Sequence, residues 1–538
     1  MQSSFDAIVI GGGVNGCGVA RDLALRGLRV GLVEKRDLGA GASGHSSGMI
    51  HGGPRYLTRE MHVTRASSTD AGYIRRIAKH LTFRVPFLIP IDRRTSRAYV
   101  EAFEAFWEAY DRYQPLKEGK PHTRLGRAEA LRIEPGLAES VASALTFDEW
   151  GIDGARLCIA NAVDAREHGA TILTHRAVRA IVRDGARVAG VVLDDGARLE
   201  APVTLNVAGP WAPRVAALAG VRVRVRPGKG VHLFYPRRVS NYAIMAVAVD
   251  GRWVFLEPHQ NGALLGTTDD DFYGNPDELD ATQDETEYLL QAIATAFPRI
   301  REHRFVRATV GVRPTLWAYG KLEDNLSRDH AITDHAEEGA PGLVTMIGGK
   351  LAAYRSMCEE LADVAAARVG NRATCRTHLE PLPGAEAPLP DVDAIADTHR
   401  VPSIAGVRLC ARQGARAGRV LDAGGEAGRG VLCPCEPVLA CEVTAAIRDE
   451  GATSIDDLRR RTRLAEGACQ GTICIGRAAA ALHACGADVA AVHRSVRESL
   501  DERFRGRVPA LDAGGANLAQ EELMQGRYFL VGDYARVA

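Results

Sequence analysis

A glycine-rich loop between two short apolar runs constrains the fold of this chain more than any other feature. Residues 6–36 read DAIVIGGGVNGCGVARDLALRGLRVGLVEKR. The runs at 7–10 and 30–33 are typical of buried parallel strands, and a helical pattern ending near Arg26 separates them. Such a G-x-G-x-x-G loop lets the backbone approach a pyrophosphate, and an acid about 20 residues further on can bind ribose hydroxyls. The pattern therefore predicts a Rossmann-like dinucleotide site built on Gly11, Gly13, Gly16 and Glu34.

The loop that follows the second strand favours FAD over a nicotinamide cofactor. Residues 39–57, GAGASGHSSGMIHGGPRYL, are small and polar and lead to His51-Gly52-Gly53. FAD needs such a loop because its flavin and ribityl chain continue past the pyrophosphate and must be enclosed. We therefore expect Ser43, Ser46 and His51 to contact the cofactor.

Two later segments repeat the strand-then-glycine pattern. Residues 186–211 predict a hairpin and a returning strand that ends in Ala208-Gly209, and residues 343–357 predict a strand, a turn at Gly348-Gly349 and a helix. Glycines at the ends of parallel strands let the backbone approach a ligand at the carboxyl edge of a sheet. The FAD-binding part is therefore expected to be discontinuous, over 1–80, 150–215 and 340–370. A sheet-based substrate part would fill 81–149 and 216–339.

Composition narrows the class of protein. The 538 residues suggest three or four domains. Lys and Arg total 67, as do Asp and Glu, so no nucleic-acid partner is expected. An odd total of 11 cysteines argues against a disulfide framework. The chain has no secretory segment and no apolar stretch near the ~20 residues that span a bilayer. We expect a cytoplasmic protein whose membrane contact is peripheral or through a partner.

Four further motifs, HGGPRYL, GTTD, GVRP and GGKLAAYR, occur in a family order. With them the sequence resembles the FAD-dependent glycerol-3-phosphate dehydrogenases of the glycine-oxidase-like flavoprotein superfamily, from residue 1 to about 370. With NRATCRTHLEPLPG and DLRRRTR…GACQGTIC, nearly the whole chain resembles the catalytic A subunits of the anaerobic, quinone-linked members. Two departures are Ala352-Ala353, where the family usually carries a Thr before the Tyr, and Pro54, where Leu or Ala is usual.

The resemblance implies a mixed α/β fold and an activity. The Rossmann-like FAD-binding part would be interleaved with the substrate part. The reaction would be the oxidation of sn-glycerol 3-phosphate to dihydroxyacetone phosphate, with hydride transfer to FAD. The resemblance supplies Arg55 and Arg313 as phosphate-binding and catalytic residues, since planar guanidinium groups bind phosphate bidentately. Lys350 would lie at the flavin pyrimidine edge, where a positive charge stabilises reduced flavin.

The remaining predicted contacts come from both parts of the chain. Tyr56 and the GTTD threonines Thr267 and Thr268 are expected to hydrogen-bond the substrate. His232 is the first candidate for the base that takes the hydroxyl proton, although residue patterns alone do not identify that base. Val178 is also expected to contact the cofactor.

The C-terminal region carries a second chemical signature, in four cysteines spaced C-x-C…C-x4-C. They are Cys433, Cys435, Cys469 and Cys474. The spacing resembles the 2Fe-2S module of bacterioferritin-associated ferredoxin, which needs four thiolates. Helices are expected between the pairs, the second starting at Ser454 with a capping Asp457, and Cys441 and Cys485 are expected to be packing thiols. Four thiolates also bind zinc, so zinc remains an alternative, as does a segment without metal.

The sequence predicts four consecutive regions: 1–375 for the oxidoreductase, 376–430 as a linker, 431–485 for the small helical iron–sulfur domain, and 486–538 as a C-terminal extension. The resemblance implies a flavin-containing B subunit together with a membrane-associated iron–sulfur C subunit that reaches a quinone in anaerobic respiration. The chain would then associate peripherally with the inner face of the cell membrane. Two alternatives stay open: an FAD enzyme acting on another small hydroxy or amino acid, and a non-enzymatic metal-sensing scaffold.

Overall fold

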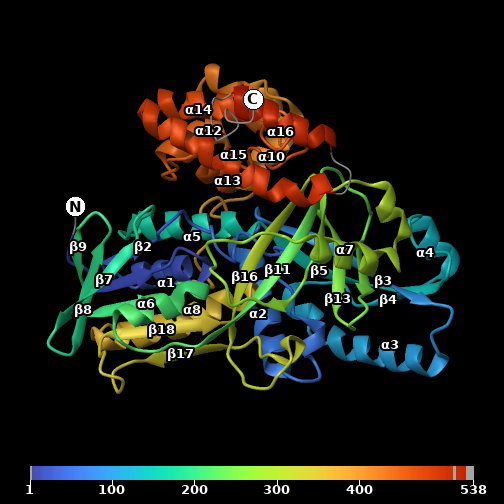
Figure 1. Ribbon diagram of the computed structural model, residues 1–538, viewed down its shortest axis with the longest axis horizontal. Coiled ribbons are helices and arrows are strands. Elements are labelled where there is room, and N and C mark those ends of the chain that lie inside the picture. The colour runs from blue at the N-terminus through green and yellow to red at the C-terminus, as the bar shows by residue number, and fades with distance from the viewer. Residues whose placement is uncertain (1–2, 513–515, 529–538) are drawn as a thin grey trace.

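Two sheets lie side by side beneath a C-terminal layer of helices (Figure 1). The computed structural model describes residues 3–512 and 516–528. Residues 1–2 of the predicted oxidoreductase region, and residues 513–515 and 529–538 of the predicted extension, lie outside the described residues. The mixed α/β architecture that the sequence predicts is confirmed.

The first sheet has six strands in the order β17-β18-β10-β1-β2-β6. Its strands are β1 (Ala7–Ile10), β2 (Val30–Val33), β6 (Thr171–Leu173), β10 (Val203–Asn206), β17 (His330–Asp334) and β18 (Leu343–Gly348). All neighbours run parallel except β17 and β18. Since β17 belongs to this sheet, residues 330–334 are part of it and not of the substrate part predicted for 216–339.

The register of this sheet brings its ligand-binding loops to one edge. Ile10 pairs with Asn206 on one side and with Val33 on the other. The residues that follow, including Gly11 and Glu34, therefore emerge together at the carboxyl edge of the sheet, where open α/β sheets bind ligands.

Both faces of the six-stranded sheet are covered. Helices pack on one face around one apolar cluster: α1 (Val14–Leu25), α5 (Gly154–Glu167) and α8 (Tyr354–Arg368). A three-stranded sheet covers the other face: β7 (Val178–Asp184), β8 (Arg187–Leu193) and β9 (Arg198–Glu200). The near-continuous apolar runs of β1 and β2 follow from this burial on both sides.

The second sheet has nine strands and forms the other half of the catalytic region. Its strands are β3 (Thr82–Asp92), β4 (Thr123–Gly126), β5 (Val141–Ile152), β11 (Val225–Tyr235), β12 (Ala243–Val247), β13 (Trp253–His259), β14 (Gly262–Gly266), β15 (Asp270–Asp271) and β16 (Arg307–Leu316). One face packs against α3 (Arg97–Asp111), and the other against α4 (Arg127–Ile133) and α7 (Gln283–Ala294). Helix α2 (Met61–Ile77) belongs to the apolar cluster of α1, α5 and α8, and α6 (Ala212–Leu218) packs beside β8 and β18.

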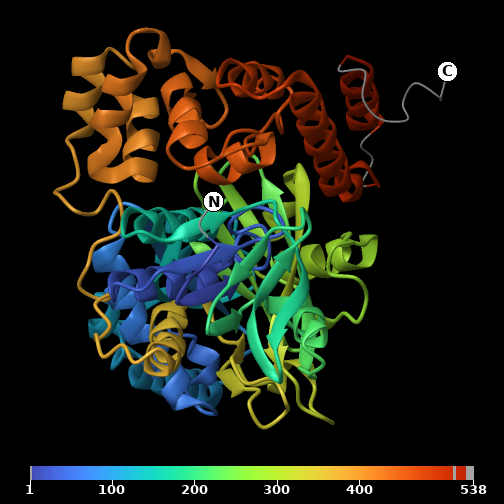
Figure 2. The same cartoon turned by 90° about the vertical axis from the view of Figure 1, so that its left-hand side faces the viewer.

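The C-terminal helical body, residues 392–512 and 516–528, lies across one side of both sheets (Figure 2). Its elements are α9 (Val392–His399), α10 (Ser403–Gln413), α11 (Ala417–Gly424), β19 (Val431–Cys433), β20 (Val438–Leu439), α12 (Ala440–Arg448), α13 (Ile455–Thr462), α14 (Ile475–Ala484), α15 (Val489–Asp512) and α16 (Ala516–Tyr528).

The linker predicted for 376–430 is wrong for residues 392–424, which form three packed helices. Leu409 of α10 and Leu421 of α11 share one apolar cluster with Leu439 and Cys441. The glycines that suggest a loose segment instead end helices, since Gly414 and Gly425 have φ of +53° and +58° at the C-termini of α10 and α11.

The helices predicted around the cysteines are present. The Ser454 side chain accepts from the Asp457 backbone N–H and Asp457 reaches back to the Ser454 N–H, which is the predicted capping box of α13. Cys474 is the N-cap residue of α14. Among the described residues, no helix is both long and apolar enough to cross a membrane.

Candidate active site

The glycine-rich loop holds the start of α1 tightly against β1. Gly11 has a φ of +116°, and a Cβ on Gly16 would overlap the carbonyl oxygen of Gly11. Gly16 therefore serves close packing, whereas Gly13 faces a cavity beside Ser43, whose hydroxyl accepts from the Val14 N–H at 3.0 Å. The first residues of this helix, Val14 and Asn15, line the same cavity, and a helix N-terminus suits a pyrophosphate.

Glu34 closes the opposite side of this turn. Its Oε2 accepts from the Gly12 N–H at 2.7 Å, and its Oε1 accepts from the Arg36 N–H at 2.8 Å. The carboxylate lies on the wall of the same cavity, at the end of β2. This is where the ribose of a dinucleotide is bound in Rossmann-like sites.

One cavity of about 980 Å³ runs from the glycine-rich loop to the second sheet. It collects nearly all the predicted cofactor residues: Gly11, Gly13, Glu34, Ser43, Ser46, His51, Val178, Ala208, Gly209, Gly348, Gly349 and Lys350. Gly16 is the exception, for the packing reason given above. A cavity of this length, with a helix start and an acid at one end, fits an extended dinucleotide such as FAD.

Three arginines gather at the far end of the cavity. Arg313 Nη1 lies 3.0 Å from Asp269 Oδ1, and Arg328 Nη2 lies 2.5 Å from Asp269 Oδ2. Arg55 Nε donates to the Tyr56 hydroxyl at 2.7 Å. The predicted residues Arg55, Tyr56 and Arg313 are thus brought together, and Arg328 is a third cation beside them.

Lys350 lies between these three arginines and the loop of residues 39–57. Its Nζ donates to the carbonyl oxygens of His51 and Gly52 at 3.3 and 3.4 Å, and it lies 4.9 Å from the centre of the Tyr56 ring. Burial lowers the pKa of Lys350 to about 7. The amine therefore exchanges a proton near neutral pH.

Of the predicted catalytic and substrate-binding residues, His232 and Thr268 are not among the described residues that line the cavity. His232, on β11, is buried, and its Nε2 lies 2.9 Å from the hydroxyl of Ser47, which does line the cavity. The Thr268 hydroxyl accepts from the Val231 N–H, whereas Thr267 faces the cavity and accepts from Arg313. Burial, and then the charge of Arg313, lower the pKa of His232 to about 3, so the ring is neutral.

An aromatic wall was not predicted from the sequence. It lies between α3 and the nine-stranded sheet and includes Trp107 of α3 with Phe87, Phe147 and Phe255 of the sheet. Phe87 and Phe147 stack with ring centres 5.1 Å apart. Flat apolar walls of this kind suit one side of a planar ring system and exclude water.

Arg328 and Asp269 were also missed as site residues. Asp269 belongs to the GTTD motif, which was the available signal, whereas Arg328 lies outside every motif used above. Burial of the Asp269 carboxyl is outweighed by Arg313 and Arg328, so its pKa lies below the usual value. The pair of arginines on one carboxylate leaves this end of the cavity with net positive charge.

Comparison with known proteins agrees with this geometry. Residues 6–355 match the family described as FAD dependent oxidoreductase. The chain is 34% identical to the A subunit of the anaerobic glycerol-3-phosphate dehydrogenase of Escherichia coli K12, over 98% of this chain and 96% of that protein. The A1 subunit of the Haloferax volcanii enzyme is 32% identical, over 97% and 90% of the two chains.

The chain belongs to the FAD-dependent oxidoreductases, in the family of anaerobic glycerol-3-phosphate dehydrogenase A subunits. The fold is similar to that of a glycerol-3-phosphate dehydrogenase from Bacillus halodurans complexed with FAD, with a TM-score of 0.74 and 23% identity over 94% of this chain and 96% of that one. The protein is an oxidoreductase and its cofactor is FAD, as the sequence predicted.

The four cysteines of the C-terminal body form two pairs. The thiols of Cys433 and Cys474 are neighbours, as are those of Cys435 and Cys469. The Cys474 thiol beside it lowers the pKa of Cys433 below its ordinary value. Within the described part of the chain, no three of these sulfurs lie all within 4.8 Å of one another.

Proposed function

We propose that the protein oxidises sn-glycerol 3-phosphate to dihydroxyacetone phosphate. The observation that carries this proposal is the cluster of Arg55, Arg313 and Arg328 around a single carboxylate, Asp269, at the end of the cavity. Three guanidinium groups with one acid between them suit a phosphate dianion better than an amino acid. The names of the relatives, glycerol-3-phosphate dehydrogenases, support the same substrate.

In this proposal one set of residues binds the substrate and another takes its hydroxyl proton. FAD, when bound, accepts a hydride from the substrate carbon. Arg313 and Arg328 bind the phosphate, and Arg55 and Tyr56 close its other side, which places the hydroxyl of the substrate near Lys350 and Ser47. The aromatic wall excludes water from this end.

We propose His232 as the proton acceptor, acting through the Ser47 hydroxyl. The substrate hydroxyl would pass its proton to Ser47 Oγ as Ser47 passes its own to His232 Nε2. Burial, and then repulsion by the charge of Arg313, make His232 a weak base. A phosphate dianion on Arg313 would remove that repulsion, so the base would gain strength when substrate is bound.

A 2Fe-2S cluster on Cys433, Cys435, Cys469 and Cys474 is proposed for the C-terminal body. The two thiol pairs support it, because each iron of such a cluster takes two ligands. A tetrahedral zinc ion would bring all four sulfurs to about 3.8 Å from one another. Zinc is therefore the less favoured alternative.

We propose that residues 1–375 form the flavin-dependent part and residues 431–485 the cluster domain. In this proposal a flavin-containing B subunit together with an iron–sulfur C subunit takes the electrons onward to a membrane quinone. The chain would then lie at the inner face of the cell membrane through those partners. Membership of the A-subunit family supports the existence of such partners.

Anaerobic titration of the purified protein tests the function. Glycerol 3-phosphate is expected to bleach the flavin absorbance, whereas glycine, sarcosine and glycerol leave it unchanged. Bleaching by an amino acid instead would establish the alternative enzyme class, and no bleaching by any substrate would favour the scaffold hypothesis. Iron and acid-labile sulfide counts on the same sample test the cluster, and zinc in their place would refute it.

A further inference from the structure

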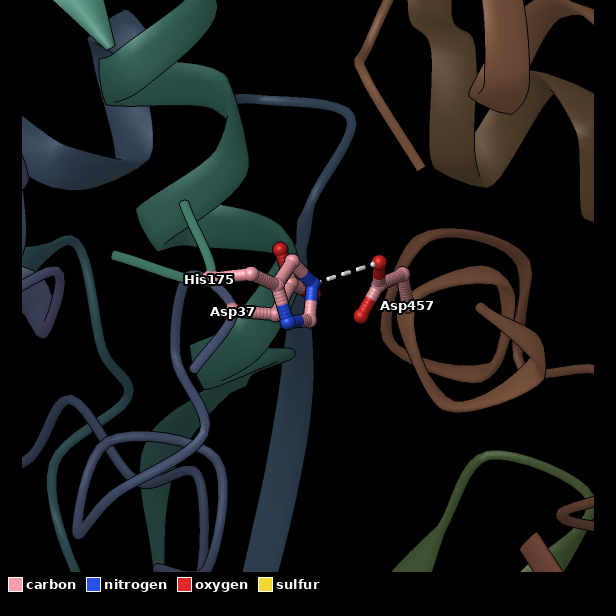
Figure 3. Close-up of side chains that lie close together, drawn as sticks. All are labelled: Asp37, His175 and Asp457. Carbon is pink, nitrogen blue, oxygen red and sulfur yellow. Dashed lines mark hydrogen bonds and ion pairs between the residues drawn. The ribbon is translucent and has the colours of Figure 1, made fainter. Parts of the chain in front are cut away.

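A cluster of buried charges joins the flavin-binding region to the C-terminal helical body. Asp37, in the loop after β2, is fully buried, and the guanidinium of Arg461 from α13 grips its carboxylate at 2.7 and 2.9 Å. Arg460 Nε adds a third bond at 2.8 Å. Figure 3 shows Asp37 and His175 facing Asp457 of α13 across the interface, with His175 Nε2 3.0 Å from Asp457 Oδ2.

The trio of Asp37, His175 and Asp457 is close enough to suggest a metal site, but its electrostatics oppose one. Both oxygens of Asp37 already accept from the two arginines. Their charges would repel a cation, and the Asp457 carboxylate is occupied by backbone N–H groups at the start of α13. The cluster is therefore a set of ion pairs that joins the flavin-binding region to the C-terminal helical body.

The loop that carries Asp37 is also the loop that shapes the adenosine end of the cofactor site. Asp37 is three residues beyond Glu34, and the Arg36 N–H between them donates to Glu34 Oε1. The Gly39 N–H donates to the carbonyl oxygen of Gly12 at 2.9 Å. The loop is thus bonded both to the ribose-binding acid and to the glycine-rich turn.

The turn after β6 supports the same loop from its other side. The His175 N–H donates to the Arg36 carbonyl at 2.7 Å, and the Arg176 N–H donates to the Glu34 carbonyl at 2.9 Å. The side chain of His175 meanwhile contacts Asp457 of the body. Both segments around the ribose position are therefore held by α13.

We propose that Asp37 is a positioning residue for the adenosine half of FAD, and that Arg460 and Arg461 of the C-terminal body hold it in place. Without those arginines the buried Asp37 carboxylate carries an uncompensated charge, which the loop can relieve only by moving toward water. Glu34 moves with the loop. The contact of Asp37 with Arg460 and Arg461 and the affinity for FAD are thereby coupled, and the coupling is reciprocal.

The chain provides a matched control for this proposal. Arg156 of α5 binds Glu450 of the body through two bonds of 2.6 and 2.7 Å, with both side chains buried. This pair also joins the flavin-binding region to the body, but its side chains bond neither Glu34 nor the loop that carries Asp37. Glu450→Gln weakens docking of the body but keeps the Glu450 carbonyl oxygen that accepts from Arg461, so the contacts of Asp37 remain.

The test is the affinity of the full-length apo-protein for FAD, followed by quenching of flavin fluorescence. Asp37→Asn removes the carboxylate that Arg460 and Arg461 hold, which releases the loop from α13. It is expected to weaken binding by about 5- to 150-fold, the usual range of coupling between sites, whereas Glu450→Gln changes it less than about twofold. Equal effects of the two variants, or no effect of Asp37→Asn, would overturn the proposal. If Asp37→Asn does not fold, Arg460→Gln, which removes one bond of the three, must weaken FAD binding in the same direction.

A second probe locates the effect on the cofactor. ADP carries only the adenosine half of FAD, so Asp37→Asn is expected to weaken ADP binding by the same factor as FAD binding. Unchanged ADP affinity beside weakened FAD affinity would place the loss at the flavin end and refute the role of Asp37. A general loss of stability would weaken both ligands equally as well, and Glu450→Gln, which destabilises the same interface, is the control for it.

Discussion

Two groups of arginines in this protein differ in how completely carboxylates neutralise them. At the end of the cavity, Arg313 and Arg328 share the single carboxylate of Asp269. At the interface with the C-terminal body, three arginines meet three buried carboxylates: Arg156, Arg460 and Arg461 with Glu450, Asp37 and Asp457. The first group keeps a positive charge that can bind an anion. The charges of the second group are balanced, and its ion pairs hold the two regions together. The same residue type thus binds a ligand or fixes a domain according to its local charge balance.

Removing an arginine of the cavity should give the largest effect, and on activity alone. Arg313→Ala is expected to lower kcat/KM for glycerol 3-phosphate about 100- to 1000-fold, because a desolvated charge contact to the phosphate is lost. Steady-state assay with an artificial dye acceptor measures it. Turnover within a few-fold of the unmodified protein would show that Arg313 does not bind substrate.

Breaking the ion pair of Arg156 and Glu450 should instead lower the free energy of unfolding. Glu450→Gln leaves Arg156 buried without its charge partner, which costs about 3 kcal/mol in unfolding free energy. Urea denaturation at pH 7 measures the change. A variant as stable as the parent would show that the interface does not depend on this pair, and the contrast with the cavity arginines would fail.

The proton route through Ser47 depends on the cavity arginines and should show an intermediate effect. Ser47→Ala is expected to lower kcat about 100-fold with little change in KM, because it disconnects His232 from the substrate hydroxyl. The variant Ser46→Ala, one residue away in the same loop, is the comparison. An equal loss of kcat in both variants would point to the shape of the loop and not to proton transfer.

The smallest effect, a change of stability with pH, should come from His175, the half-exposed residue of the interface charge cluster. Its hydrogen bond to Asp457 raises its pKa above the ordinary value of 6.5. A raised pKa means that the folded state binds the proton more tightly, so this contribution is complete below pH 6.5 and is lost as the pH rises through the raised value. Proteolysis between the two regions should therefore quicken slightly in that window, and His175→Gln should abolish this pH dependence.

Patterns that act over short distances along the chain were predictable. The glycine-rich turn, the strands at 7–10 and 30–33, and the cap of α13 all depend on residues close in sequence. The prediction of a linker was wrong because a glycine-rich stretch is found both in loops and where short helices end. Which threonine of GTTD faces the cavity depends on strand register, and so does the burial of His232, which pairs with Gly266.

By itself the sequence determined the dinucleotide loop, the choice of FAD and the family, because these rest on local motifs in a fixed order. Only the tertiary structure decided which charges meet. Asp37 and Arg461 are 424 residues apart, and Arg328 reaches Asp269 from outside every motif. The physical reason is that the energy of a charge depends on its burial and its partners, and both are set by folding rather than by neighbours in the chain.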